Sequence, residues 1–246
     1  MSSNLYVSAA GAMARLTQLD LVANNLANAG TTGYKRDGAM FESVLQNSLT
    51  DSEGEIVLGA PGLNFVRSYG IGSDFEAGSI EKTGVPLDFA ILGPGFLEIQ
   101  TDDGPRYTRS GSLKVDAAGN LTTSDGQLVA GIGGPIQASG IGVHVSPSGQ
   151  ILDGANVELD RLKIVEFENL LELKKGGSQR YEALEGANPT QVERPTLVPQ
   201  SLEGSNVNTV LEMSTLVILQ RAFEANIKIL QADDDATKRL IREVRG

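Results

Sequence analysis

Two apolar stripes with helical spacing, one near each end, constrain the fold of this chain most. The N-terminal stripe steps alternately by four and three residues, which is a heptad spacing. It consists of Leu5, Ala9, Ala12, Leu16, Leu19, Ala23 and Leu26. A similar C-terminal stripe consists of Val207, Leu211, Thr215, Ile218, Ala222, Ala225, Ile229, Ala232 and Ala236. Because a helix must bury such a stripe, the sequence predicts two long helices that pair with each other or with other copies of the chain.

An ordinary pair of helices in a globular core is the alternative, and the length of the second helix argues against it. That helix is expected to begin after Gly204, and a capping box is possible at Thr209 and Glu212. Asn206 and Asn208 are alternative N-caps. At about 1.5 Å per residue the helix spans more than roughly 50 Å. A small β domain is too short to cover it.

The middle of the chain has the period and the turns of β structure. The sequence predicts a short helix over residues 38–49 and an extended arm over residues 50–79. From about Ile80 the period changes to two, and short apolar runs alternate with Gly and Asp-Gly turns; the chain has 29 Gly. These runs predict strands at residues 87–90, 95–100, 106–108, 112–115, 120–122, 127–129, 143–145, 150–152 and 162–167.

The expected fold class is α+β. Long N- and C-terminal helices are expected to pair in a coiled-coil-like terminal domain, next to a central antiparallel β-rich domain. The terminal domain with its extended arm comprises residues 1–79 and 200–246, and the central domain comprises residues 80–199. Pro189, Pro195 and Pro199 indicate an extended return arm at the end of the central domain.

Charge and cysteine content exclude several classes of partner and site. Asp and Glu total 31 against 20 Lys and Arg, so the net charge is −11, which disfavours nucleic acid and anionic membranes as partners. With no Cys, disulfides and thiolate metal sites are impossible. Neither a cleaved secretory signal nor direct membrane insertion is expected, because no basic segment leads into a long apolar run.

No group of residues has the spacing of a catalytic or metal site. The one histidine, His144, lies in an alternating strand segment and lacks a partner for a triad or a His-based metal site. Residues 233–235 are three aspartates, but successive helical side chains point about 100° apart and cannot converge on one ion. The Asp102–Gly104 run reads as a hairpin turn. The sequence therefore predicts a protein that is not an enzyme and has no cofactor.

Three segments of the chain carry distinctive motifs. Residues 21–36 read LVANNLANAGTTGYKR, and residues 203–208 read EGSNVN. They resemble the N-terminal and C-terminal signatures of the flagellar axial proteins, and specifically of the basal-body rod family. Residues 95–121 resemble the β domain that rod and hook proteins share. The motif residues are Asn24, Asn25, Leu26, Ala27, Asn28, Gly33, Tyr34, Lys35, Gly204, Ser205, Asn206, Val207 and Asn208.

The resemblance implies a structural subunit that polymerises into a helical tube in the periplasmic part of the basal body. Such a tube transmits torque and encloses an export channel. The implied partners are other copies of the chain, neighbouring rod proteins below and above it, and the flagellar type III export apparatus. Residues 202–208 resemble the proximal-rod branch of the family more than the distal-rod branch, which is the alternative. A wall-binding or wall-remodelling module on flagellar-type ends is a further alternative.

Two sets of helical residues acquire expected roles from this resemblance. The assembly seam is expected to be buried between subunits; it consists of Leu5, Leu16, Leu19, Ala23, Leu26, Leu211, Ile218, Ala222, Ala225 and Ile229. The family places the closing helix innermost in the tube. Gln220, Glu224 and Gln231, on another face of that helix, are therefore expected to face the channel.

Overall fold

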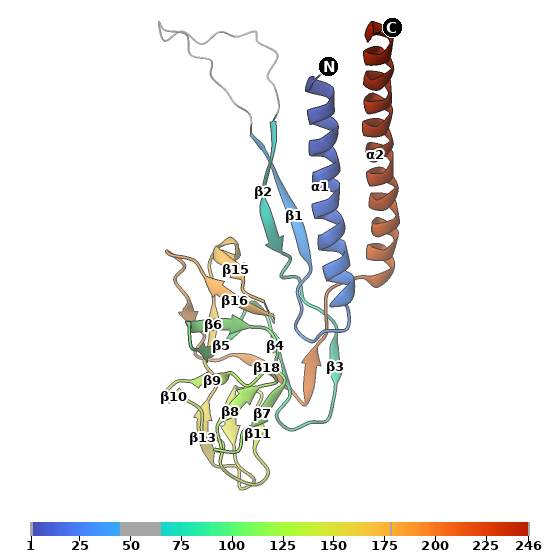
Figure 1. The fold of residues 1–246 in the computed structure, drawn as a ribbon. Helices are drawn as coiled ribbons and strands as arrows, with labels where there is room; N and C mark the ends of the chain where they lie inside the picture. The colour runs from blue at the N-terminus through green and yellow to red at the C-terminus, as the bar shows by residue number, and fades with distance from the viewer. Residues whose placement is uncertain (1, 45–64, 178, 246) are drawn as a thin grey trace, which may run out of the picture.

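The computed structural model describes residues 2–44, 65–177 and 179–245 (Figure 1). A β-rich body lies at one end, and two helices and a β-hairpin extend away from it. Helix α1 spans Ser2–Ala27, α2 spans Thr209–Arg245, and a short 3-10 helix spans Leu170–Glu172. The strands are β1 Asp37–Val44, β2 Phe65–Ser73, β3 Ile80–Lys82, β4 Phe89–Leu92, β5 Phe96–Thr101, β6 Gly104–Thr108, β7 Leu113–Val115, β8 Leu121–Thr123, β9 Leu128–Gly131, β10 Gly134–Pro135, β11 His144–Val145, β12 Gln150–Leu152, β13 Glu158–Arg161, β14 Ile164–Glu166, β15 Leu173–Lys175, β16 Arg180–Ala183, β17 Thr190–Gln191, β18 Thr196–Pro199 and β19 Ser201–Glu203.

The body is built around a ten-stranded sheet. Its main path runs β15-β16-β6-β5-β9-β8-β7, with β10 beside β9, and β14 paired with both β5 and β17. The strands β5 and β6 form the predicted hairpin, in which Thr101 pairs with Gly104. A three-stranded sheet, β11-β12-β13, completes the far end of the body. The period-two reading of this region is confirmed, because strands lie at or within two residues of each predicted run.

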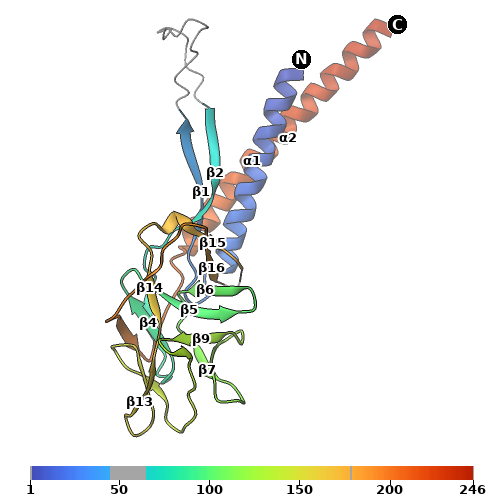
Figure 2. The ribbon, with the colours of Figure 1, turned by 90° about the vertical axis from the view of Figure 1, so that its left-hand side faces the viewer.

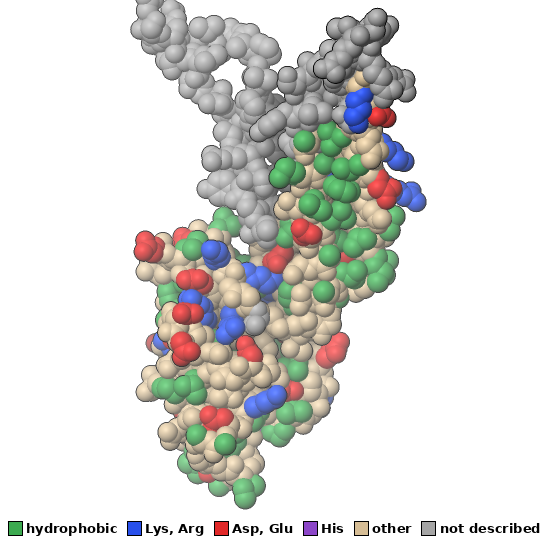
Figure 3. Space-filling model, in the orientation of Figure 1, with side chains coloured by type: hydrophobic (Ala, Val, Ile, Leu, Met, Phe, Trp, Pro, Cys, Tyr) green, Lys and Arg blue, Asp and Glu red, His purple; other side chains and the backbone are tan. Residues whose placement is uncertain are grey.

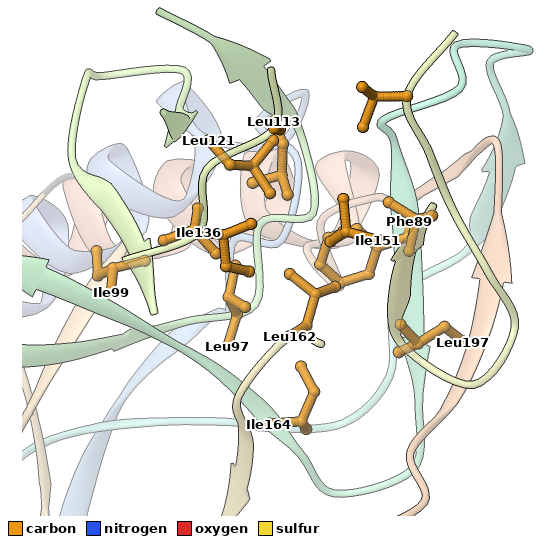
Figure 4. Close-up of a cluster of buried hydrophobic side chains, with 14 of the residues drawn as sticks. Phe89, Leu97, Ile99, Leu113, Leu121, Ile136, Ile151, Leu162, Ile164 and Leu197 are labelled. Carbon is orange, nitrogen blue, oxygen red and sulfur yellow. The ribbon is translucent and has the colours of Figure 1, made fainter. Parts of the chain in front are cut away.

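Two clusters of buried side chains form the core of the body. The larger is aliphatic, and Figure 4 shows its members from several strands pointing toward one another, including Leu97, Leu121, Ile136, Ile151 and Leu162. The smaller is aromatic and brings together Phe96, Tyr107, Phe167 and Tyr181. The buried residues of both clusters all lie within residues 80–199, and Phe75, from the segment between β2 and β3, packs against the aromatic cluster. Neither helix contributes a buried residue to this core.

The predicted fold class, with terminal helices paired in a coiled-coil-like domain, is wrong. The described residues form a body of many strands and only two α-helices. Helices α1 and α2 contact each other over part of their length, and a Cβ on Gly11 of α1 would lie 3.7 Å from Asn226 Nδ2 of α2, but Figure 2 shows their outer ends diverging. A coiled coil would keep both helices on one shared apolar seam along their length.

Side-chain burial along α2 shows why the heptad reading failed. The predicted stripe residues Leu211, Ile218 and Ile229 are exposed. The buried positions in this part of α2 lie one residue further on, at Glu212 and Leu219. The most deeply buried residue of this face, Glu212, is polar, and a count of apolar residues does not include it.

The predicted short helix over residues 38–49 is also wrong in its described part. Residues 37–44 are strand β1, which pairs antiparallel with β2 from Asp37↔Ser73 to Val44↔Phe65. Periodicity alone cannot separate a short helix from a strand, and the partner strand lies far along the chain. Residues 45–49, and the part of the expected extended arm over residues 50–64, lie outside the described residues.

The chain enters and leaves the body through neighbouring strands. Strand β3 pairs with β19, and β4 pairs with β18, so the two connections to the helices form one narrow ribbon. The expected domain boundaries, at residues 79–80 and 199–200, fall at this ribbon. Within the described parts of the chain, neither helix is apolar over a long enough stretch to cross a membrane.

Candidate functional site

Motif residues from the two ends of the chain meet in one buried polar junction. The junction lies where the base of α1, the base of the β1–β2 hairpin, the start of α2 and the body come together (Figure 1). It consists of Asn24, Asn25, Tyr34, Lys35, Arg36, Asp37, Arg109, Lys175, Glu203, Asn206 and Glu212.

The centre of the junction is a buried ion pair between Lys35 and Glu203. Lys35 Nζ lies 2.6 Å from Glu203 Oε1, and the side chains are 0% and 2% exposed. Lys35 Nζ also donates to the backbone oxygen of Glu76 at 2.7 Å. Burial lowers the pKa of Lys35, while the Glu203 carboxylate opposes that shift. The pair joins the segment after α1 to the segment before α2, 168 residues apart.

Arg109 brings the body to the same carboxylate. Its Nη1 lies 3.8 Å from Glu203 Oε2, and its Nη2 donates to the backbone oxygen of Gly93 at 2.8 Å. Burial lowers the pKa of Arg109, against the opposing effect of Glu203. Two cations therefore face one buried carboxylate, which compensates the cost of removing that carboxylate from water.

A second group surrounds Tyr34. Its hydroxyl lies 2.8 Å from Asn24 Oδ1 and 3.1 Å from Asn25 Oδ1. Asn25 also donates to the backbone oxygen of Asp37 and accepts from its amide, both at 2.8 Å. Burial, followed by the charge of Asp37, raises the pKa of Tyr34. Asn25 thus pairs the end of α1 with the first residue of β1.

Asn206 and Glu212 attach the start of α2. Asn206 Oδ1 accepts from the Arg36 amide at 2.7 Å, and its Nδ2 donates to the backbone oxygen of Asp74 at 2.8 Å. The buried Glu212 carboxylate accepts from Arg36 Nε. Glu212 therefore does not serve the predicted capping box. Asn208 caps α2 instead, accepting from the Leu211 amide at 3.1 Å.

Two glycines allow the backbones to approach at the junction. Gly33 has φ +70°, and a Cβ there would lie 2.7 Å from the Ser110 amide nitrogen. A Cβ on Gly78 would lie 2.0 Å from the Gly204 oxygen. A side chain at Gly33 would push against the body, and a side chain at Gly78 would push against the segment that leads into α2.

The remaining motif residues lie around the junction without entering its polar centre. Asn28 Nδ2 donates to the Asn24 oxygen at 2.9 Å, and the Gly204 amide donates to the Ser79 oxygen at 2.7 Å. Ser205 Oγ accepts from the Val207 amide at 3.2 Å. Leu26 is half-buried and Ala27 is exposed.

The assembly-seam residues are not brought together in the single chain. Leu19, Leu26 and Ala222 are half-buried. The exposed ones are Leu16, Ala23, Leu211, Ile218, Ala225 and Ile229, and the side chain of Leu5 lies outside the described ones. Gln220, Glu224 and Gln231 are exposed as well, and Gln220 Nε2 lies 3.5 Å from Glu224 Oε1. The roles of both sets stay predictions.

Sequence reasoning missed half of the junction. It singled out Asn24, Asn25, Tyr34, Lys35 and Asn206 as site residues. It did not single out Arg36, Asp37, Arg109, Lys175, Glu203 or Glu212. Glu203 is the first residue of the EGSNVN motif, so an acidic side chain within that motif is the signal that could have found it. No sequence signal marks Arg109 and Lys175 as site residues, because only the fold brings them near the other residues of the junction.

The contacts of the junction join segments that lie far apart along the chain. Its charged side chains pair with one another, and the amide groups of Asn25 and Asn206 bond to backbone groups. Among the described residues, no group of three or more His, Cys, Asp or Glu side chains is placed to hold a metal ion.

A large apolar face lies on α2, above the junction. Its exposed side chains in the first turns include Val210, Leu211, Met213, Val217 and Ile218, which is 67% exposed. Figure 3 shows apolar side chains gathered over this helix. No described segment covers them. Soluble single chains rarely present such a continuous apolar patch unless it binds a partner.

Comparison with known proteins matches three segments of the chain, and the first and third include Lys35 and Glu203. Residues 5–35 match the family model described as "Flagella basal body rod protein". Residues 90–153 match the model described as "Flagellar hook protein FlgE/F/G D1 domain". Residues 198–243 match the model described as "Flagellar basal body rod FlgEFG protein C-terminal". The basal-body rod protein FlgF of Caulobacter vibrioides is 32% identical over 233 residues, covering 94% of this chain and 93% of the relative.

Two further relatives match over a similar span. FlgF of Escherichia coli is 34% identical over 252 residues, covering 96% of this chain and 95% of the relative. The basal-body rod protein FlgG of Bacillus subtilis is 30% identical over 262 residues, covering 98% of each.

Proposed function

Because the chain belongs to the flagellar basal-body rod protein family, we propose that its terminal helices polymerise with neighbouring subunits into a helical tube around an export channel. It is a structural subunit of the rod, located in the basal body, and it associates with other rod components. We also propose that the tube transmits torque and lies in the periplasm. We propose that the chain is exported through the flagellar type III apparatus and that its role is not enzymatic.

The apolar face of α2 is the observation that carries this proposal. Leu211, Ile218 and Ile229 are all more than half exposed, and they fall on one stripe of the helix at steps of seven and eleven. The partner that suits this stripe is a neighbouring rod subunit, since both helices fall within family-matched segments. Contacts that repeat head to tail without closing into a ring form a helical filament.

Replacing one residue of the stripe tests the proposal. Ile229→Asp would place an unpaired carboxylate in a buried contact, at a cost of several kcal/mol per subunit. Incorporation of the subunit into rods, assayed in purified basal bodies, should be lost. The melting of the body should not change, because its core clusters do not include α2.

Gln231→Asp is the matched control, because it adds the same charge two residues away, off the stripe of Leu211, Ile218 and Ile229. Normal incorporation of Ile229→Asp, or equal loss in both variants, would argue against assembly through this stripe.

We further propose the proximal position in the rod, with the distal position as the alternative. FlgF and FlgG relatives are about equally similar to the chain, at 34% and 30% identity, so the proposal rests on the run at residues 202–208. Expression in a host that lacks its proximal-rod protein should restore motility, whereas expression in a host that lacks its distal-rod protein should not. The reverse pattern would assign the distal position.

A further inference from the structure

A lysine outside the matched segments connects the body to the junction. Lys175 is the last residue of β15, the first strand in the path of the ten-stranded sheet. It pairs with Tyr181 of β16, and β16 in turn pairs with β6. Lys175 is therefore fixed to the sheet of the body. Figures 1 and 2 both show β15 beside the base of the β1–β2 hairpin.

The Lys175 ammonium group has three partners in the junction. Its Nζ lies 2.8 Å from Asp37 Oδ2 and donates to the backbone oxygen of Lys35 at 3.1 Å. It also lies 3.8 Å from the centroid of the Tyr34 ring, within the range of a cation–π interaction. A carboxylate, a carbonyl and an aromatic face, all from the segment that follows α1, thus bind one cation of the body.

The Asp37 carboxylate is held in place for this contact. Its Oδ1 accepts from Ser73 Oγ at 2.8 Å, and its backbone is paired with Asn25. The side chain of Asp37 is 10% exposed and that of Lys175 is 21% exposed. Without Lys175, Asp37 would be a largely buried carboxylate with no facing cation among the described residues, and such a charge disfavours the closed arrangement.

The position of this contact determines what it can do. The covalent connections between the body and the helices all pass through the β3–β19 ribbon, which has only two strands. A two-stranded ribbon is weak by itself and twists easily. Lys175 contacts the helix base from β15, away from that ribbon. Because this contact lies at a distance from the ribbon, it can fix the angle between the body and the helix base, which the ribbon alone cannot fix.

We propose that Lys175 is a positioning residue that holds the body at a fixed angle to the helix base, so that the subunit moves as one rigid piece. This role rests on the proposed function, because rigidity is useful in a rod that carries load. It deepens that function by naming the contact that joins the assembling helices to the body. The latch consists of Lys175, Asp37 and the Tyr34 ring.

Hydrogen exchange on the purified full-length chain tests the latch without requiring rod assembly. In Lys175→Met, which keeps the aliphatic part of the side chain, the junction amides of Gly33, Arg36 and Asp37 should exchange about tenfold faster or more. These amides bond to the Glu203 oxygen, Asn206 and Asn25. The body amides of Leu121 and Ile136 should exchange as in the wild type.

Lys174→Met is the matched control, since Lys174 lies next to Lys175 on β15 and is exposed. It should leave both sets of amides unchanged, and Lys175→Arg, which keeps the cation, should restore most of the junction protection. Unchanged junction protection in Lys175→Met, or a loss spread equally over junction and body, would overturn the proposal. A latch confirmed by exchange in a chain that fails to enter rods would contradict the proposed function alone.

Discussion

The charged residues of the junction determine each other's environment. Lys35 and Glu203 are both almost completely buried, so each charge depends on the other for compensation. Removing one partner of such a pair is far more costly than replacing both with apolar residues. The junction therefore works as a unit whose members cannot be exchanged singly.

Replacing Lys35 should strongly destabilise the chain. Lys35→Met leaves the Glu203 carboxylate with Arg109, at 3.8 Å, as its remaining cation, and should cost about 3–5 kcal/mol of unfolding free energy. Urea unfolding of the full chain measures this. Lys114→Met, at an exposed position of β7, should change the stability by less than about 0.5 kcal/mol. A Lys35→Met chain as stable as this control would mean that the pair contributes nothing.

Buried tyrosines predict a stability that falls in alkaline solution. Burial raises the pKa of Tyr34 and of Tyr181 above the ordinary 10.0, so above pH 10 the folded state keeps protons that the unfolded state releases. That contribution to stability is complete below pH 10 and is lost as the pH rises above it.

The comparison of Tyr181→Phe with the wild type isolates this effect. The lowered pKa of Lys35 acts in the opposite direction, but it acts equally in both chains. The ring of Tyr181 packs against Phe75 and Phe96, and phenylalanine preserves that packing. Between pH 9 and pH 11 the wild type should lose more unfolding free energy than the variant. Parallel pH profiles would exclude the buried phenol as the cause.

At the scale of elements, the sequence predicts the strands of the body better than it predicts strand β1 or the buried face of helix α2. The short strands are predictable because Gly and Asp-Gly turns such as Asp102–Gly104 mark where each one ends. Strand β1 is not, because its partner β2 lies beyond a long intervening segment. The buried face of each helix near the junction is not predictable from apolar spacing, because it includes a polar residue, Asn25 in α1 and Glu212 in α2.

The candidate site follows the same division. Tyr34, Lys35 and Asn206 could be predicted because they stand in contiguous motifs. Arg109 and Lys175 could not, because each lies on a body strand, or just after one, that the fold alone brings to the helix base. No spacing along the chain encodes that approach.

The exposed polar face of α2 gives a prediction about transport through the rod. Gln220 and Gln231 are exposed and uncharged, and an export channel needs a wall to which unfolded chains do not adhere. Replacing both with leucine should leave rod assembly intact and slow the delivery of later axial proteins, measured as hook length over time. Unchanged delivery in a rod that contains the double variant would remove the support for a channel-facing role.

At the scale of the whole molecule, the body is expected to fold independently of the outer helices. Residues 80–199 contain both core clusters apart from the half-buried Phe75, whereas the outer part of α2 is covered on one side only. Trypsin added to the purified chain should therefore cut at Arg15, Arg221 and Lys228 before it cuts within residues 80–199. Earlier cleavage in the body would contradict this division into domains.

The most direct test of the central claim is a density map of the assembled rod at side-chain resolution. Our account predicts that α2 lies innermost, with Ile218 and Ile229 buried between neighbouring subunits and Gln220 and Gln231 facing the channel. It also predicts that the Lys35–Glu203 pair and the contact of Lys175 with Asp37 are kept in every subunit. A map in which Ile218 and Ile229 face water, and the subunits contact each other only through their β-rich bodies, would contradict the claim that this chain assembles through its terminal helices.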